Sequence, residues 1–117
     1  MITGLHHFAI IVSSEKSIPF YEKLGFRVHY AKKRRCDKIV LLDGYGIQLE
    51  MFIDSKHPSR TTNPENLGLR HLALKVNMIE KTVEELGIKS GPVMKDWIGM
   101  RFCFVMDPDG LPIELHE

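Results

Sequence analysis

Apolar and polar residues follow one another along this chain in short runs of strand length, and helical spacing interrupts them twice. The first run, 4–12, is apolar and begins with glycine, as expected of a largely buried strand. Residues 14–25 then supply a helix start, an apolar stripe and a terminating glycine. Three more strand-like runs follow, at 26–34, 37–43 and 46–53. The pattern predicts the order strand, helix, strand, strand, strand.

The second half of the chain repeats this order. A polar linker, 54–66, contains Pro58 and Pro64 and separates the halves. Beyond it the pattern predicts a strand at 68–76, a helix at 77–86 and strands near 92–95, 100–106 and 111–116. We therefore expect one domain, 1–117, with internal repeat modules 1–53 and 67–117.

The halves also match residue by residue at an offset of 64 positions. Between 4–12 and 68–76, glycine, leucine, histidine, alanine and valine recur in step. Between 43–50 and 107–114, aspartate, glycine and glutamate recur. This period is too long for a solenoid unit. It indicates a duplicated small module, so the predicted fold class is α+β with two βαβββ modules.

One imidazole and one carboxylate recur within the repeat. Glu50 follows His7 by 43 positions, and Glu114 follows His71 by the same number. Both glutamates have apolar neighbours, and a carboxylate in such a setting needs a partner because an unpaired charge out of water is costly. Imidazole and carboxylate are common ligands of divalent first-row metals. We therefore predict that all four side chains bind one divalent metal ion.

Strand alternation places three further polar side chains on the same faces as these four residues. They are Gln48, Lys75 and His116. Each is a candidate for contact with a substrate, and each could equally be a solvated strand residue. His6 points away from His7 by the same rule, so we assign it to the surface or to the surroundings of the metal site.

Composition narrows the function classes. The chain has a formal net charge of +1, and its longest basic run, 32–35, lies in strand-like sequence. Such a run is more typical of a solvated sheet edge than of a nucleic-acid site. Cys36 and Cys103 lie in apolar strand-like runs and are predicted to be buried thiols. No signal peptide and no membrane-length apolar run is found, so a cytoplasmic protein without nucleic-acid or membrane partners is expected.

Three segments resemble the vicinal oxygen chelate superfamily, and the likeness covers almost the whole chain. They are LHHFAIIV at 5–12, FYEKLGF at 20–26 and DPDGLPIE at 107–114. The superfamily includes glyoxalase I, fosfomycin-modifying thiol transferases, extradiol dioxygenases and metal-free antibiotic-binding proteins. The resemblance implies a curled, half-barrel mixed sheet around one metal, with the helices outside. It also implies a homodimer.

The ligand pattern separates the branches of this superfamily. Glyoxalase I has a His/Glu/His/Glu set, which corresponds here to His7, Glu50, His71 and Glu114. Fosfomycin enzymes and dioxygenases have two histidines and one glutamate as metal ligands, and they lack an equivalent of Glu50. The resemblance therefore implies a metal-dependent enzyme similar to lactoylglutathione lyase. Its ion is expected to be nickel, cobalt, zinc or manganese.

The resemblance also implies a mechanism. A glutamate, Glu114 or Glu50, transfers a proton of a small 2-oxoaldehyde–thiol adduct through a metal-stabilised enediolate, and Glu114 is the preferred base. Glutathione-using bacterial members carry an arginine four residues after the first ligand, where this chain has Ile11. Another thiol, or a plain hydroxycarbonyl compound, is therefore expected as the substrate.

Two alternatives stay open at this point. One is a thiol transferase for an epoxide such as fosfomycin, and the other is a protein that binds a small molecule without catalysis. The sequence does not distinguish a site within one chain from a site completed across a dimer.

Overall fold

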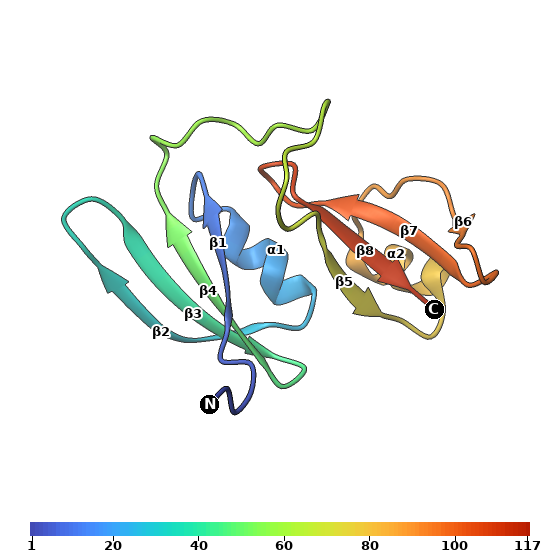
Figure 1. Ribbon diagram of the computed structural model, residues 1–117, viewed down its shortest axis with the longest axis horizontal. Coiled ribbons are helices and arrows are strands. Elements are labelled where there is room, and N and C mark those ends of the chain that lie inside the picture. Colours follow the sequence, from blue (N-terminus) through green and yellow to red (C-terminus); the bar gives the residue numbers. More distant parts are fainter. The chain divides into compact units, whose positions relative to one another are not determined.

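The computed structural model describes residues 1–117, and these divide into two compact units, Met1–Pro58 and Ser59–Glu117. Each unit contains one open, mixed, four-stranded sheet and one helix (Figure 1). The predicted α+β class and the βαβββ order of both halves are confirmed. The placement of the module boundaries at 53 and 67 stays a prediction. Neither helix is long and apolar enough to cross a membrane.

The first unit has its strands in the spatial order β1-β4-β3-β2. The bounds of its elements are β1 Phe8–Val12, α1 Ser17–Lys23, β2 Arg27–Lys33, β3 Lys38–Gly44 and β4 Ile47–Ile53. β1 runs parallel to β4, and the other neighbours are antiparallel. β1 and β2 are therefore the edges of this sheet. The basic run lies at the exposed end of β2, as predicted for a solvated edge.

The second unit repeats this topology as β5-β8-β7-β6. Its elements are β5 Leu72–Lys75, α2 Ile79–Leu86, β6 Met94–Lys95, β7 Arg101–Met106 and β8 Pro112–His116. The duplication extends to the hydrogen-bonding register. Ala9 lies beside Glu50 across the parallel pair of the first unit, and Ala73 lies beside Glu114 across that of the second.

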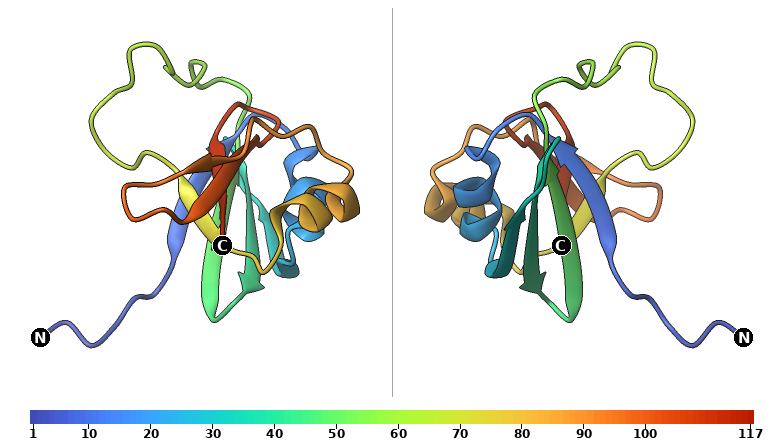
Figure 2. Two further views of the ribbon diagram at one scale, coloured as in Figure 1. Left: turned by 90° about the vertical axis from the view of Figure 1, so that its right-hand side faces the viewer. Right: turned by 90° about the vertical axis from the view of Figure 1, so that its left-hand side faces the viewer.

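The core of the first unit lies between α1 and one face of its sheet, and Figure 2 shows the helix on that one side. Tyr21 and Leu24 are the buried apolar residues at the helix. The sheet contributes Val12, Val40, Leu42, Leu49 and Met51. Each large apolar side chain buried in this way contributes roughly 1.5–3 kcal/mol relative to exposure. The opposite face, which we call the open face of the first unit, carries the alternate residues Ala9, Ile11, Gln48, Glu50 and Phe52.

The second unit is built in the same way. Ile79 of α2 is buried, and one face of the sheet contributes Cys103, Val105, Ile113 and Leu115. The open face of the second unit carries Ala73, Lys75, Phe102, Phe104, Glu114 and His116. In both units the strand alternation therefore separates an apolar, helix-covered face from a face that holds the candidate chemistry.

The first strand of each unit is shorter than predicted. The expected strands 4–12 and 68–76 are reduced to Phe8–Val12 and Leu72–Lys75. Each is an edge strand, and its register with β4 or β8 begins only at Phe8 or Leu72, so the residues before it have no ladder to join. Figure 2 shows the N-terminal residues leading away from β1.

The cysteine prediction is half wrong. Cys103 is buried in β7 as expected, whereas Cys36 is exposed, and neither forms a disulfide. Cys36 lies in the connection between β2 and β3, where Arg34 N–H donates to the Asp37 carbonyl at 2.8 Å. Only two residues are left for the turn, so the thiol projects from a tight loop instead of from a strand.

The last hairpins of the two units differ in length. In the first unit Tyr45 and Gly46 form the turn with positive φ angles of 55° and 75°. In the second, the turn 107–110 extends to Leu111 and uses Gly110 at a φ of 83°. Leu41 consequently pairs with Glu50, whereas Phe104, one residue earlier in the repeat, pairs with Glu114.

Asp107 should be a main support of the second hairpin. It is buried, and its Oδ1 accepts from Asp109 N–H and Leu111 N–H, each at 2.8 Å. Asp107→Ala removes both bonds and is expected to cost about 2–3 kcal/mol of unfolding free energy in urea titrations. Asp107→Asn retains an acceptor oxygen and should lose less than half as much. Equal losses in the two variants would contradict the role given to these bonds.

Candidate metal centre

His7 and Glu50 meet on the open face of the first unit. His7 lies two residues before Ala9, and Ala9 is in register with Glu50, so both side chains project from the same side of the sheet. His7 Nε2 is 2.9 Å from Glu50 Oε2. The other ring nitrogen, Nδ1, lies 2.8 Å from Nδ1 of His6. His6 therefore belongs to the immediate surroundings of the pair.

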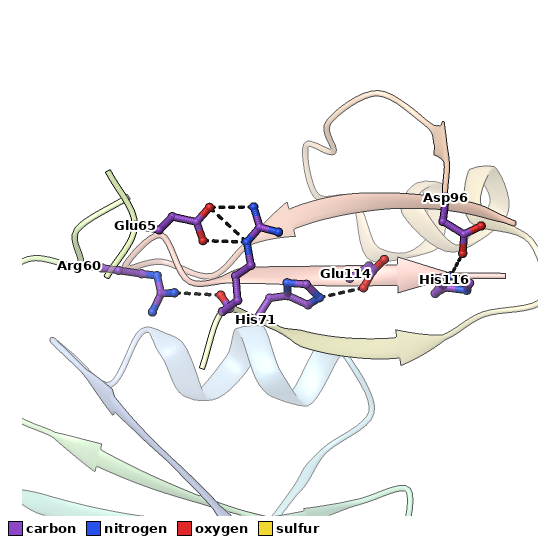
Figure 3. A network of polar contacts seen from close by, with 7 residues as sticks. Arg60, Glu65, His71, Asp96, Glu114 and His116 are labelled. Atoms are coloured by element: carbon purple, nitrogen blue, oxygen red, sulfur yellow. Dashed lines mark hydrogen bonds and ion pairs between the residues drawn. The ribbon is translucent and has the colours of Figure 1, made fainter. Parts of the chain in front are cut away.

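His71 and Glu114 meet in the same way in the second unit (Figure 3). His71 Nε2 is 2.9 Å from Glu114 Oε2, and the side chains are 25% and 15% exposed, against 35% and 21% in the first pair. The ring of Phe104 meets the His71 imidazole edge to face, with 5.2 Å between the ring centroids. The second pair is thus the more enclosed of the two.

The segment before His71 is fixed by ion pairs instead of by a second histidine. Arg70, at the repeat position of His6, forms a two-pronged ion pair with Glu65, with contacts of 2.8 Å. Arg60 donates to the Arg70 carbonyl at 2.9 Å (Figure 3). These contacts hold the backbone that leads into β5. The two imidazoles therefore keep the same direction through different neighbours.

The donor atoms of each pair are spaced as two ligands of one ion would be. Two atoms bound at right angles at about 2.1 Å from a metal lie about 3.0 Å apart. Both observed separations are 2.9 Å. Neutral imidazole nitrogen and carboxylate oxygen are also the correct donor types for nickel, cobalt, zinc or manganese. The residues present in each unit therefore fit half of the predicted ligand set.

Within either unit, no group of three or more His, Cys, Asp or Glu side chains is arranged to hold a metal ion. A metal of this kind takes at least four ligands, so a single pair is insufficient. The binding of one ion by all four residues stays a prediction.

The three candidate substrate residues have different surroundings. Gln48 is half-buried in β4 opposite Asp43, and Lys75 is exposed in β5 beside His116. His116 has both ring nitrogens engaged: Nδ1 lies 2.7 Å from the Glu117 carbonyl and Nε2 lies 3.1 Å from Asp96. Lys75 is thus the most accessible of the three. Contact of any of them with a substrate stays a prediction.

His116 also ties a turn to the sheet. The hydrogen bonds with the Glu117 carbonyl and the Asp96 carboxylate raise the pKa of His116. The imidazole stacks on Phe102, with 10° between the ring planes. Asp96 Oδ1 accepts from the N–H groups of Ile98 and Met100, so His116 anchors the whole 96–100 turn. These contacts give the residue a structural role in addition to any role toward a substrate.

Two residues beside the pairs have no counterpart in the sequence predictions. Phe104 contacts His71, and Arg34 lies over Phe52, two residues from Glu50. Strand alternation around the two-residue turn could have placed Arg34 on the open face. The one-residue difference in hairpin length hid Phe104, because a constant repeat offset puts its neighbour Val105 opposite Glu114.

Comparison with known proteins identifies a family. The model of the Glyoxalase/Bleomycin resistance protein/Dioxygenase superfamily matches residues 4–115. The uncharacterised protein YwkD of Bacillus subtilis is 43% identical over 100% of this chain and 98% of its own length. The uncharacterised protein YaeR of Escherichia coli is 37% identical over 97% and 95%. A glyoxalase family protein of Enterococcus faecalis is 41% identical over 97% of both chains, with a TM-score of 0.89.

More distant solved structures share the fold alone. FosX, a fosfomycin resistance protein of Listeria monocytogenes, was solved as a variant with Mn(II) and a dihydroxypropylphosphonic acid; it is 23% identical, with a TM-score of 0.74 over 99% of this chain and 92% of its own. Lactoylglutathione lyase of Agrobacterium tumefaciens is 16% identical, with a TM-score of 0.69 over 99% and 94%.

Proposed function

Because the chain belongs to the Glyoxalase/Bleomycin resistance protein/Dioxygenase superfamily, we propose that it is a metal-dependent lyase or isomerase of the glyoxalase I type. The proposed substrate is a small 2-oxoaldehyde–thiol adduct or a similar hydroxycarbonyl compound. One observation carries the proposal: both repeats bring an imidazole and a carboxylate to 2.9 Å on an open sheet face. The presence of Glu50 favours this function over thiol transfer, for which the resemblance implies only three ligands.

The proposed metal ligands are His7, Glu50, His71 and Glu114, holding one divalent ion. The ion would supply a Lewis acid for two adjacent oxygens of the substrate. His6 and Phe104 keep the two imidazoles in position through their contacts at Nδ1 and at the ring edge. Ligands that are fixed in advance bind a metal more tightly, because less ordering is needed on binding.

Glu114 is proposed as the general base. Its carboxylate removes the proton on the carbon beside the carbonyl group and returns it to the neighbouring carbon. At 15% exposure Glu114 is more enclosed than Glu50 at 21%, so water competes less for its oxygens. Gln48 and Lys75 are proposed to contact the oxygens of the substrate, and His116 to contact it from the end of β8.

The resident ion is proposed to be nickel, cobalt, zinc or manganese. The borderline imidazole and hard carboxylate donors of this set suit all four metals. The manganese in the FosX structure shows that the fold accommodates such an ion in that protein.

Metal binding can be tested with a matched pair of histidine variants. His71→Ala removes one proposed ligand and should weaken Ni or Zn binding by about a hundredfold or more. His57→Ala removes a surface histidine that lies 3.4 Å from Asp54, and it should leave the affinity unchanged. Calorimetric titration of chelator-treated protein measures both. Unaltered affinity in His71→Ala, or no binding above trace in the parent, contradicts the proposed ligand set.

The base can be tested by amide substitution. Glu114→Gln keeps an oxygen that can coordinate but cannot take a proton, so turnover should fall about a hundredfold or more while the metal stays bound. The assay uses methylglyoxal with glutathione, bacillithiol or cysteine, and metal content is measured on the same samples. If Glu50→Gln loses turnover and Glu114→Gln keeps it, the roles of the two glutamates are exchanged. If neither matters, proton abstraction by these residues is wrong.

The same assay includes fosfomycin as a substrate. Consumption of the epoxide without turnover of any oxoaldehyde adduct favours the thiol transferase. If nothing is turned over and a small ligand raises the melting temperature, the result favours a protein that binds a small molecule without catalysis.

We also propose a homodimer. Both sheets end in edge strands. On the open face of the first unit, 55% of the surface of Ile11 is exposed. Light scattering at micromolar concentration should therefore give about twice the chain mass of 13.5 kDa. A mass equal to that of one chain would contradict the proposal.

A further inference from the structure

The turn between β2 and β3 directs an arginine onto the open face of the first unit. Arg34 and Asp37 close this two-residue turn, and their side chains project on the same side of the sheet as Phe52. The guanidinium carbon of Arg34 lies 5.6 Å from the centre of the Phe52 ring. Arginine over an aromatic face is a favourable cation–π arrangement. The basic run therefore contributes to the open face as well as to the solvated edge.

Asp37 fixes the orientation of this guanidinium. Arg34 Nε donates to Oδ1 at 2.7 Å, and Nη2 donates to Oδ2 at 2.6 Å. The hydrogen bonds to Asp37 raise the pKa of Arg34, so the group keeps its charge throughout the working pH range. Both bonds use one edge of the guanidinium fork, which leaves the Nη1 amino group for another acceptor.

The position of Arg34 relates it to Glu50, the proposed metal ligand on β4. Phe52 is two residues beyond Glu50 and faces the same side, so their backbones are about 7 Å apart. The charge of Glu50 also acts on the Arg34 guanidinium. A small molecule that reacts beside Glu50 can therefore also reach the Arg34 guanidinium, which lies about one substrate length farther along the strand.

The surroundings of the turn carry an excess of positive charge. A shallow hollow of about 530 Å³ is lined there by Lys33, Arg34, Arg35 and Lys38, with Glu15 and Asp37 as the acidic residues. Lys38 is paired with Glu15 at 2.6 Å, and Arg34 with Asp37. Arg35 and Lys33 add two further positive charges, and although Lys33 lies on the helix side where it also acts on Glu15, the net charge at this end of the sheet favours the approach of an anion.

We propose that Arg34 binds an anionic group, a carboxylate or a phosphate, carried by the substrate, and so selects charged over neutral substrates. Arginine suits this task because its planar N–H groups match the oxygens of such anions in geometry as well as in charge. Selection among substrates rests on the proposed function, whereas binding of the anion does not. Ile11, which lies beside Phe52 in the ladder, carries no charge, and Arg34 supplies the positive group at this place.

Anion binding can be measured directly on chelator-treated protein, where no metal competes. Acetate and inorganic phosphate are titrated at constant ionic strength and followed by amide chemical shifts. Arg34→Gln should weaken binding about tenfold, and Arg34→Lys, which keeps the charge without the fork, about threefold. Arg35→Gln is the matched control: it removes the same charge from the same turn and should change affinity by less than about twofold.

A variant of Asp37, the residue that Arg34 is bonded to, makes the test independent of folding defects in Arg34→Gln. Asp37→Asn removes a negative charge beside Arg34 and keeps an amide oxygen that can accept from the guanidinium, so it should tighten anion binding by about threefold. The inference is overturned if Arg34→Gln and Arg35→Gln behave alike, if Asp37→Asn weakens binding, or if neither anion binds the parent. The tighter of acetate and phosphate identifies the preferred anion.

Activity then connects the anion to the substrate. With oxoaldehyde adducts, Arg34→Gln should raise KM for those that carry a carboxylate or a phosphate by about tenfold and leave neutral ones unchanged. Failure of metal binding with intact anion binding contradicts the proposed function alone. Intact metal binding and turnover without an Arg34 effect contradicts this inference alone.

Discussion

The parallel pairing of the first and last strands of each unit is the constraint on which the candidate centre depends. The hydrogen bonds of this pairing set Ala9 beside Glu50 and Ala73 beside Glu114. A histidine two residues earlier, directly before the first strand, then projects next to the carboxylate. A slip of one residue would turn the whole first strand over and carry the imidazole to the helix side of the sheet. The register therefore controls the core and the chemistry together.

The two faces of each sheet consequently have different roles, one in the core and the other in the candidate site. The helix-covered face of the first sheet has an apolar centre, where Val40, Leu42, Leu49 and Met51 admit almost no water. The open face carries the carboxylates, the imidazoles and Arg34, all of them partly hydrated. Substitutions on the open face can thus alter chemistry with little effect on the core. This separation is a reason why one duplicated framework serves relatives of different function.

Much of this arrangement follows from the sequence because strands alternate strictly. The helix-side residues, the βαβββ order and both His–Glu pairs can be derived from spacing alone. The ends of β1 and β5 cannot, because the residues before Phe8 and Leu72 have strand-like composition but no neighbouring strand to pair with. The contact of Phe104 with His71 was also out of reach, since it depends on a one-residue difference between two hairpins. Arg34 was within reach, because alternation around the two-residue turn puts it on the same face as Phe52, although no glycine or asparagine marks that turn.

The difference in length between the last hairpins of the two units places different side chains beside the two glutamates. In the first unit Glu50 has the aliphatic Leu41 across the antiparallel ladder, and in the second Glu114 has the aromatic Phe104. An exact duplicate would give both carboxylates the same neighbour, and the two would then be interchangeable. A branched aliphatic side chain presents only methyl groups, whereas an aromatic ring also presents the polarised edge and face of its π-system. Under the proposed function, a change of one residue in the length of a loop therefore lets two copies of one motif take unequal parts in a reaction.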